Sequence, residues 1–378
     1  MRTGTILCVG NFELPDRNAA AHRVVNNAKL FRLLGYETVF LGACRGEVYF
    51  KGIVKRDFDA PFEMYEQSYP FSTRQWASQI FDAGNILALA RNYPDTTAVL
   101  LYNTQYATAL AVRKAFAGRD VRLLYDCTEW NAYTEGSLLK RKVKAADSRL
   151  IELRLPRRCD GIIAVSTAMR DQYGDKTPLL LLPPLVDLED PVWRQTPREA
   201  EGFTFCYAGS PSDKDRLDLL LNAFARLPKG AASLRVIGVS EKEYAALPRG
   251  DAPERLPDNV TFTGRLSHRE TVREILGCGC FVFLREPSRR NTAGFPTKFV
   301  EAFTCGVPVI TTAVSDVPSY ADDGCVILRD TAPDSVLAAM RGVLARDLPR
   351  RGLRDDFDYR SRADECRRWF ERISCNNE

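Results

Sequence analysis

The chain has 378 residues, of which 45% are hydrophobic and 27% charged, and its net charge at pH 7 is +4. At about 150 residues per domain this length predicts two or three domains, and the ordinary composition excludes disordered and fibrous architectures. The near balance of charge argues against nucleic acid as a partner, because nucleic-acid-binding domains usually carry a strong basic excess.

Histidine and cysteine usage excludes further classes of protein. The two histidines, His22 and His268, are too few for a histidine-rich zinc centre or an HExxH metalloprotease. The 11 cysteines include no CxxC pair, and a disulfide framework is expected only in a short secreted chain. Residues 1–14 lack the features of a signal peptide, and no apolar run approaches the length of a membrane span. We therefore expect a cytoplasmic protein with reduced thiols.

The first half of the chain alternates short apolar runs with segments of helical periodicity. Strands are predicted at residues 5–10, 37–42, 98–102, 122–126, 161–165 and 179–182. These runs are continuously apolar, which is typical of strands buried on both faces of a parallel sheet. Between them, apolar residues fall on one helical face at 21, 24, 28 and 31, and again at 139, 143, 146, 150 and 153. This alternation predicts an α/β fold with a doubly wound parallel sheet.

The second half repeats the alternation. Strands are predicted at residues 203–208, 234–239, 260–263, 280–284, 307–311 and 326–328. Residues 187–201 contain two prolines and many charges but little apolar periodicity, which indicates a linker. We therefore predict two Rossmann-like domains, at residues 1–186 and 202–358. A last helix within residues 359–378 has an apolar face and is expected to cross back to the first domain.

The most informative segment runs from residue 291 to residue 310. It predicts a loop, a helix that begins near Pro296 and ends at Gly306, and then a buried strand. The amides at the helix start, together with Lys298, would form an anion site. Glu301, one turn later, is placed to accept hydrogen bonds from ribose hydroxyls. The alternative is an ordinary helix whose Lys298 and Glu301 are merely solvated. No GxGxxG or Walker A pattern supports a dinucleotide enzyme or a P-loop NTPase.

The sequence GFPTKFVEAFTCGVPVI, preceded by YAGS, resembles the signature of family 4 GT-B glycosyltransferases. Residues 18–39 resemble the first loop, helix and turn of the same family, so the resemblance covers most of the chain. It implies two Rossmann-like domains facing across a cleft, with a nucleotide sugar held by the second domain and the acceptor by the first. It also implies transfer with retention of anomeric configuration. No DxD motif is placed to hold a metal, so we expect neither a metal nor another cofactor.

By this resemblance, Glu301 holds the nucleotide ribose, Lys214 contacts the diphosphate, and Gly10 lies near the donor phosphate. The full set of predicted donor-binding residues is Gly10, Ser210, Lys214, Arg285, Gly294, Phe295, Thr297, Lys298 and Glu301. The chain departs from the family pattern at two places. Ala293 stands where the first glutamate of the E-x7-E motif is expected, which leaves the donor sugar open. Ser210 replaces a common arginine, and Arg285, Arg289 or Arg290 is a candidate for the missing cation unless these arginines only form a solvated loop.

A second group of polar residues follows the predicted strand 122–126. Asp126 and Glu129 are candidate catalytic residues that would bind or deprotonate an acceptor hydroxyl. Thr128 aligns with a histidine that many family members place near the reacting sugar. Arg23, on the first helix, is a candidate for contact with the acceptor or a phosphate. The alternative is a capped loop in which Asp126 or Thr128 accepts backbone N–H groups.

The expected partners are a UDP- or GDP-linked sugar and a glycan or polyprenyl-linked acceptor. A segment rich in lysine and arginine at residues 140–158 would suit contact with anionic lipid headgroups, although a charged helix is also explained by solvation alone. Two rival functions stay open. The protein would be a nucleotide-sugar 2-epimerase of the same architecture, or a catalytically silent partner that binds a nucleotide sugar within a transferase complex.

Overall fold

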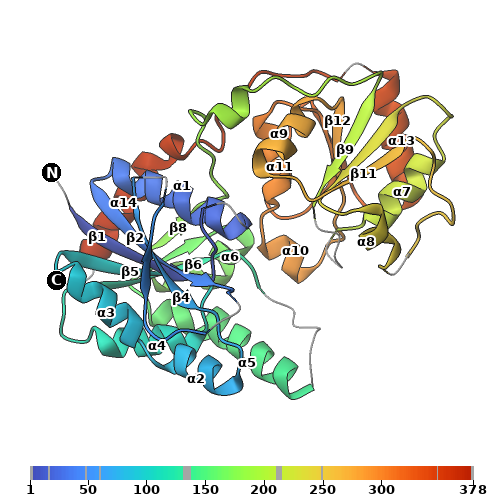
Figure 1. The fold of residues 1–378 in the computed structure, drawn as a ribbon. Helices are drawn as coiled ribbons and strands as arrows, with labels where there is room; N and C mark the ends of the chain where they lie inside the picture. Colours follow the sequence, from blue (N-terminus) through green and yellow to red (C-terminus); the bar gives the residue numbers. More distant parts are fainter. Residues whose placement is uncertain are drawn as a thin grey trace. The chain divides into compact units, whose positions relative to one another are not determined.

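The computed structural model describes residues 3–15, 18–46, 49–58, 61–130, 138–209, 215–247, 250–346 and 348–375, without the side chains of residues 139 and 140. The chain divides into two compact units (Figure 1). One comprises Met1–Val186 with Asp358–Glu378, and the other comprises Asp187–Phe357. Each unit contains one sheet dominated by parallel strands, so the predicted α/β class with two Rossmann-like sheets is confirmed.

The first unit is built on an eight-stranded sheet with the order β3-β4-β2-β1-β5-β6-β7-β8. Six of these strands were predicted: β1 (Gly4–Gly10), β2 (Tyr36–Cys44), β5 (Thr96–Tyr102), β6 (Arg122–Cys127), β7 (Gly161–Ala164) and β8 (Leu179–Leu181). The prediction missed β4 (Glu63–Ser68), which is parallel to β2, and β3 (Val54–Arg56), which is antiparallel to β4. β3 is the edge strand and β4 lies between it and β2; Arg56 Nε of β3 donates to the Glu66 carboxylate of β4 at 2.8 Å.

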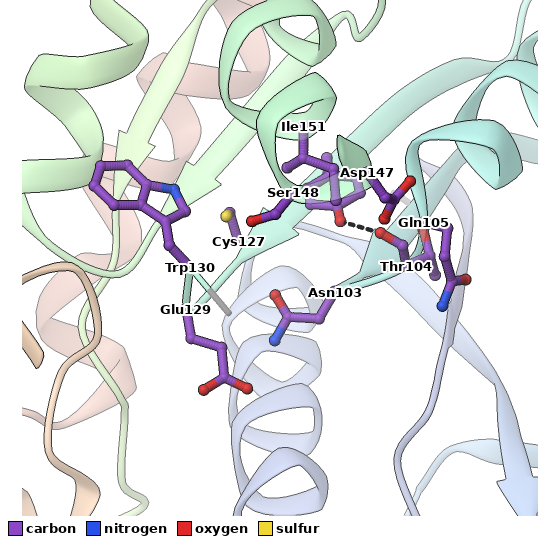
Figure 2. A pocket seen from close by; sticks show the side chains of 10 residues that line it. Asn103, Thr104, Gln105, Cys127, Glu129, Trp130, Asp147, Ser148 and Ile151 are labelled. Atoms are coloured by element: carbon purple, nitrogen blue, oxygen red, sulfur yellow. Dashed lines mark hydrogen bonds between the residues drawn. The ribbon is translucent and has the colours of Figure 1, made fainter. Parts of the chain in front are cut away.

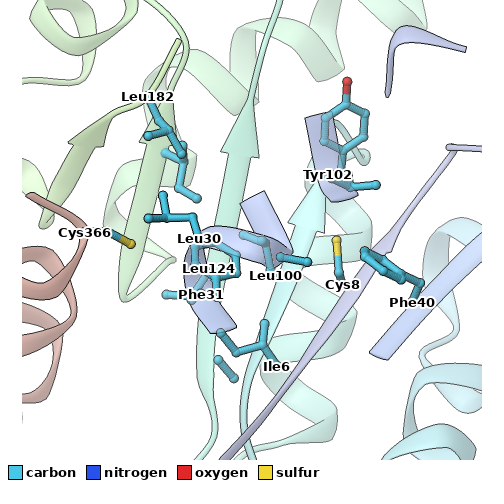
Figure 3. Close-up of a cluster of buried hydrophobic side chains, with 14 of the residues drawn as sticks. Ile6, Cys8, Leu30, Phe31, Phe40, Leu100, Tyr102, Leu124, Leu182 and Cys366 are labelled. Carbon is cyan, nitrogen blue, oxygen red and sulfur yellow. The ribbon is translucent and has the colours of Figure 1, made fainter. Parts of the chain in front are cut away.

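Helices cover both faces of the first sheet. Its helices are α1 (Ala19–Leu33), α2 (Thr73–Phe81), α3 (Gly84–Asn92), α4 (Tyr106–Ala115), α5 (Leu138–Arg154), α6 (Thr167–Tyr173) and α14 (Ala363–Cys375). Figure 3 shows the core beneath α1 and α14, where Leu30 and Phe31 of α1 meet Ile6, Leu100 and Leu124 of the sheet. Successive side chains of a strand point to opposite faces. The alternate residues of the same strands therefore face the layer that contains α4.

The C-terminal helix α14 is anchored in the first unit. Trp369 is buried, and its indole N–H donates to the carbonyl of Pro178 at 3.0 Å. Gly161 of β7 leaves the room for this contact, since a Cβ there would lie 2.8 Å from the Trp369 ring and 2.5 Å from Ile373. Although it comes last in the sequence, this helix therefore belongs to the first core.

The second unit holds six parallel strands in the order β11-β10-β9-β12-β13-β14. All lie where strands were predicted: β9 (Thr204–Ala208), β10 (Ser233–Ile237), β11 (Val260–Gly264), β12 (Cys280–Phe283), β13 (Val309–Thr312) and β14 (Cys325–Leu328). The helices between them are α7 (Leu217–Ala225), α8 (Glu241–Ala245), α9 (His268–Leu276), α10 (Arg289–Ala293), α11 (Thr297–Thr304), α12 (Val317–Tyr320) and α13 (Pro333–Ala345).

Residues 187–201, which the sequence indicates as a linker, group with the second unit. A short 3-10 turn at Pro191–Arg194 buries Trp193, whose indole N–H donates to the carbonyl of Asp187 at 2.8 Å. No helix formed by the described residues is both long and apolar enough to cross a bilayer.

We predict that Trp369→Ala destabilises the first unit by about 3–5 kcal/mol, because it removes a large buried side chain and leaves the Pro178 carbonyl without its donor. Urea unfolding followed by fluorescence measures the change. Arg368→Ala, at an exposed neighbour on the same helix, is the control and is expected to stay within about 0.5 kcal/mol of the parent. Equal stability of the two variants would contradict the anchoring role of Trp369.

Candidate functional site

In the second unit, the loops after β9 and β12 are joined at the carboxyl edge of the sheet. β9 and β12 are neighbouring parallel strands, so both loops leave the same edge. Arg285 Nε, after β12, donates to the Asp215 carboxylate at 2.7 Å. The hydroxyl of Thr312, at the end of β13, accepts from the Arg285 N–H at 3.0 Å and donates to the Arg285 carbonyl at 2.6 Å. Arg285 is thereby bonded to the loop after β9 and to the end of β13, the two strands that flank β12.

Backbone packing is also tight at this edge. Gly238, after β10, has a φ of +101°, and a Cβ there would lie 2.4 Å from the carbonyl oxygen of Gly209. Ser315, after β13, holds a φ of +50° and has a buried hydroxyl with no partner among the described residues. Strained backbone of this kind clusters at functional sites.

Helix α11 begins at this edge with unused backbone donors. Pro296 is its N-cap, and the N–H groups of Phe299 and Val300 both donate to the Pro296 carbonyl, at 3.2 and 3.4 Å. Within the described part of the chain, the N–H groups of Thr297 and Lys298 donate to no protein acceptor. Because they lie at the positive end of the helix dipole, these two donors favour an anion.

Lys298 and Glu301 face one another across the first turn of α11. Lys298 Nζ lies 2.8 and 3.0 Å from the two carboxylate oxygens of Glu301. The lysine side chain is 29% exposed and the glutamate side chain 13% exposed, so the pair is within reach of solvent. Each member can therefore exchange its partner for a ligand group without opening the core.

The end of α11 was predicted correctly. Gly306 has a φ of +65° and donates its N–H to the Phe303 carbonyl at 3.0 Å, while the N–H of Val307 donates to Ala302 at 3.2 Å. This is the Schellman arrangement that terminates a helix at glycine. A Cβ at Gly306 would lie 2.3 Å from the Arg351 carbonyl oxygen. Close packing therefore requires glycine at this position as well.

Three of the predicted donor-binding residues also have structural roles. The Gly294 N–H donates to the Arg290 carbonyl at 3.1 Å and so closes α10. Phe295 is buried, with its ring 5.7 Å from Tyr320 and 5.8 Å from Phe357. The guanidinium of Arg285 is held by Asp215. Gly294 therefore closes α10, the Phe295 ring packs against neighbouring rings, and Asp215 fixes one edge of the Arg285 guanidinium. Contact of these three residues with a donor stays a prediction.

Other predicted donor residues are placed as follows. Gly10 lies at the end of β1, where a Cβ would stand 2.7 Å from the Tyr102 carbonyl oxygen, so close pairing of β1 with β5 already requires glycine there. Ala293 is fully buried at the end of α10. Ser210 and Lys214 lie outside the described residues.

In the first unit, Asp126 and Arg23 form a buried ion pair. Arg23 Nε lies 2.9 and 3.1 Å from the Asp126 carboxylate oxygens and Nη2 lies 2.7 Å away, while Nη1 donates to the Leu182 carbonyl at 3.1 Å. Asn27 adds a further donor to Asp126 at 3.1 Å. Burial by itself lowers the pKa of the Arg23 guanidinium, but the Asp126 carboxylate outweighs it and the pKa is raised.

This geometry changes the interpretation of both residues. Asp126 is fully enclosed, and its oxygens already accept hydrogen bonds from Arg23 and Asn27. We therefore assign Asp126 a positioning role rather than a catalytic one, and Arg23 a role in joining α1 to β6 rather than in contacting an acceptor or phosphate.

Glu129 lines a small pocket beside the carboxyl ends of β5 and β6, and Thr128 is bonded to Asn103, another residue of its lining. Figure 2 shows Asn103 and Glu129 among the residues that line it. Asn103 has a φ of +46°, and its side chain accepts the Thr128 N–H at 3.0 Å and donates to the Thr128 hydroxyl. The cavity, of about 30 Å³, has room for water but not for a sugar ring. Of the first-unit candidates, Glu129 is the carboxylate that reaches a pocket.

Comparison with known proteins gives a family match for part of the chain and solved structures with a similar fold. Residues 191–364 match the family model described as Glycosyl transferases group 1. No curated protein sequence matches the chain. Among solved structures, the chain is similar to sucrose-phosphate synthase from Thermosynechococcus elongatus, with a TM-score of 0.73 and 14% identity over 99% of this chain and 100% of that one.

Two further solved structures have the same architecture. HepE from Anabaena in complex with UDP-glucose gives a TM-score of 0.63 and 14% identity, over 98% of this chain and 100% of that one. The catalytic domain of starch synthase IV from Arabidopsis thaliana, bound to ADP and acarbose, gives 0.65 and 10%, over 98% and 99%. The fold is therefore that of GT-B glycosyltransferases. The match to the glycosyl transferase model lies almost wholly in the second unit, and together with the shared fold it supports a glycosyltransferase.

Several structurally important residues were missed from the sequence. Asn27, Asn103, Asp215 and Thr312 complete the hydrogen bonds described above, yet none stands in a motif. Only Asn103 and Thr312 carried a signal, since they lie at or directly after the carboxyl ends of predicted strands. The partners of Asn27 and Asp215 depend on contacts that the sequence does not reveal.

We predict that Asp126→Asn lowers the free energy of unfolding by about 3 kcal/mol, because it leaves the buried Arg23 guanidinium without a compensating charge. Glu129→Gln makes the same chemical change at a partly exposed carboxylate and is expected to shift stability by less than about 1 kcal/mol. Chemical denaturation of both variants measures the difference. If Asp126→Asn had the same denaturant midpoint as the parent protein, the ion pair would not stabilise the fold as proposed.

Proposed function

We propose that the protein transfers a sugar from a nucleoside diphosphate sugar to a hydroxyl acceptor, with retention of anomeric configuration. The observation that carries this proposal is the start of α11. There, the amides of Thr297 and Lys298 are unused by described protein groups, and the Lys298–Glu301 pair is accessible on the same turn. This combination offers donors for a diphosphate beside an acceptor for ribose hydroxyls.

Lys298 and Glu301 can each bind part of the donor once their ion pair separates. A diphosphate at the helix start would attract Lys298 Nζ and accept the two amide hydrogen bonds. The Glu301 carboxylate, released from the lysine, would then accept hydrogen bonds from two ribose hydroxyls. In the reaction, the bond between the sugar and the diphosphate breaks and negative charge grows on the departing diphosphate. The same amides and lysine stabilise that charge.

The remaining donor-side assignments follow from this arrangement. Lys214 is proposed as a second cation for the diphosphate and Ser210 as a neighbouring contact. Arg285 is proposed to position their loop through Asp215. Among the described residues, no group of three or more His, Cys, Asp or Glu side chains is arranged to hold a metal ion. We propose that amides and cations neutralise the diphosphate, with no cofactor besides the donor substrate.

A uridine or guanosine nucleotide is proposed for the donor. HepE bound to UDP-glucose and starch synthase IV bound to ADP support a nucleotide ligand for this architecture. On the acceptor side, Glu129 is proposed to bind or deprotonate the hydroxyl and Thr128 to shape its approach. A glycan or polyprenyl-linked acceptor, a cytoplasmic location and peripheral contact with an anionic membrane complete the proposal.

We predict that Glu301→Gln and Lys298→Met each weaken binding of the nucleotide sugar by about 10- to 100-fold, the range expected for losing a charge-assisted hydrogen bond. Isothermal titration with UDP- and GDP-sugars measures the affinity. Asp258→Asn and Lys229→Met remove the same charges at exposed positions near the amino ends of β11 and β10, away from the carboxyl edge, and serve as matched controls. If the α11 variants bound the donor as tightly as the controls, the proposed donor site would be wrong.

The reaction itself is predicted to release the nucleoside diphosphate only when an acceptor is present, with an acceptor product heavier by one sugar. Mass spectrometry after incubation with a donor panel and lipid-linked or free glycan acceptors measures this result. A changed donor sugar without acceptor glycosylation would indicate the 2-epimerase. Donor binding without turnover of any acceptor would indicate a silent binding partner.

A further inference from the structure

The apolar stripe of α5 points away from the core. Val143, Leu150 and Leu153 share the apolar face that the sequence pattern indicates, and their side chains are 61%, 41% and 44% exposed. Glu152 and Ile151, on the other side of the helix, are buried or half-buried. A helix that exposes its leucines while burying a glutamate carries an apolar surface that the described part of the protein does not cover.

The neighbouring helices extend this apolar surface. α2 packs beside α4 and α4 beside α5, in one layer of the first unit (Figure 1). α2 has no buried residue, and Phe71 and Phe81 at its two ends are 58% and 69% exposed. Leu110 of α4 is also exposed. Exposed apolar side chains gathered on one layer of helices indicate a candidate binding face.

The same layer is strongly basic. Ten exposed lysines and arginines lie on these three helices and on the turn that follows α5. They are Arg74, Arg113, Lys114, Arg141, Lys142, Lys144, Arg149, Arg154, Arg157 and Arg158. At about 100° per residue, Lys142 and Arg149 flank the stripe of α5 on one side and Arg154 on the other. No described Asp or Glu of α2, α4 or α5 is exposed, because Glu152 is buried and Asp147 accepts the Tyr106 N–H at 3.0 Å.

We infer that the layer of α2, α4 and α5, here called the basic face, docks on a lipid bilayer that contains anionic headgroups. Exposed Leu and Phe side chains enter the headgroup region while lysines and arginines around them meet lipid phosphates. A second copy of the chain fits less well, since a two-fold contact would set cations against cations. Nucleic acid does not account for the aliphatic stripe. The chain as a whole has a net charge of only +4, so the basic excess is local.

This inference deepens the proposed function. It rests on that function only for the benefit of docking, which would bring the active site to a lipid-linked acceptor. Binding to lipid does not require donor, acceptor or turnover. Affinity for vesicles and affinity for a nucleotide sugar can therefore be measured separately, and one can fail while the other holds.

The first experiment is flotation of the full chain with vesicles of phosphatidylcholine, with or without about one-third phosphatidylglycerol. We expect tight binding to the anionic vesicles only, weakened at least tenfold when the salt concentration rises from about 0.1 M to about 0.5 M and the charges are screened. Equal binding to both vesicle types, or no binding to either, would overturn the inference. So would self-association or capture of an acidic protein in place of vesicle binding.

The second experiment locates the contact. Lys142→Glu with Arg149→Glu, and separately Leu150→Ser with Leu153→Ser, are each expected to lower the vesicle partition coefficient about tenfold or more. Leu33→Ser and Arg255→Glu change an exposed leucine and an exposed arginine off the basic face and are the matched controls. All four proteins should unfold as the parent does and keep its donor affinity. Vesicle binding that survives both pairs of substitutions would place the contact elsewhere.

Discussion

The organisation of this protein depends on the burial of parallel strands on both faces. Only β3 is antiparallel to its neighbour among the described strands, so within each sheet the carboxyl ends of the other strands meet at a single edge. Strand interiors that are apolar on both faces have no room for charge, and polar side chains are concentrated in the residues that follow the strands. The Arg285–Asp215 contact, the Asn103–Thr128 contact and the start of α11 all occupy such positions.

Two ion pairs, Arg23–Asp126 and Lys298–Glu301, differ in how far they are buried, and this difference indicates a structural role for the first and a binding role for the second. Arg23 and Asp126 are almost completely enclosed, and their hydrogen bonds are completed by Asn27 and a backbone carbonyl. Removing either partner would strand a charge in a medium of low dielectric constant. Lys298 and Glu301 share a similar distance but keep contact with solvent. Both groups of this pair can therefore be reached from solvent, as the proposed exchange of an internal partner for a ligand requires.

The sequence predicted the fold well where apolar periodicity decides the structure. Twelve strands and the start and end of α11 were found where expected. It failed where the deciding contact lies far along the chain. The Asp126 carboxylate suggested chemistry because its partner Arg23 is 103 residues away. For α5, periodicity showed that the apolar residues share one face, but it does not show whether that face points to the core or away from it.

The replacement of the expected glutamate by Ala293 also follows from local packing. Ala293 closes α10 and is fully buried. A glutamate there would place a carboxylate in an enclosed space, at a cost that is prohibitive without a paired cation. In the proposed reaction, contacts to the transferred sugar therefore come from other residues. The loop after β13, at the carboxyl edge of the same sheet, has irregular backbone. There Ser315 holds a left-handed conformation with its hydroxyl buried and unmatched among the described residues. Strain of this kind persists only where the surrounding structure enforces it, which makes this loop the strongest place to look for sugar selectivity in the second unit.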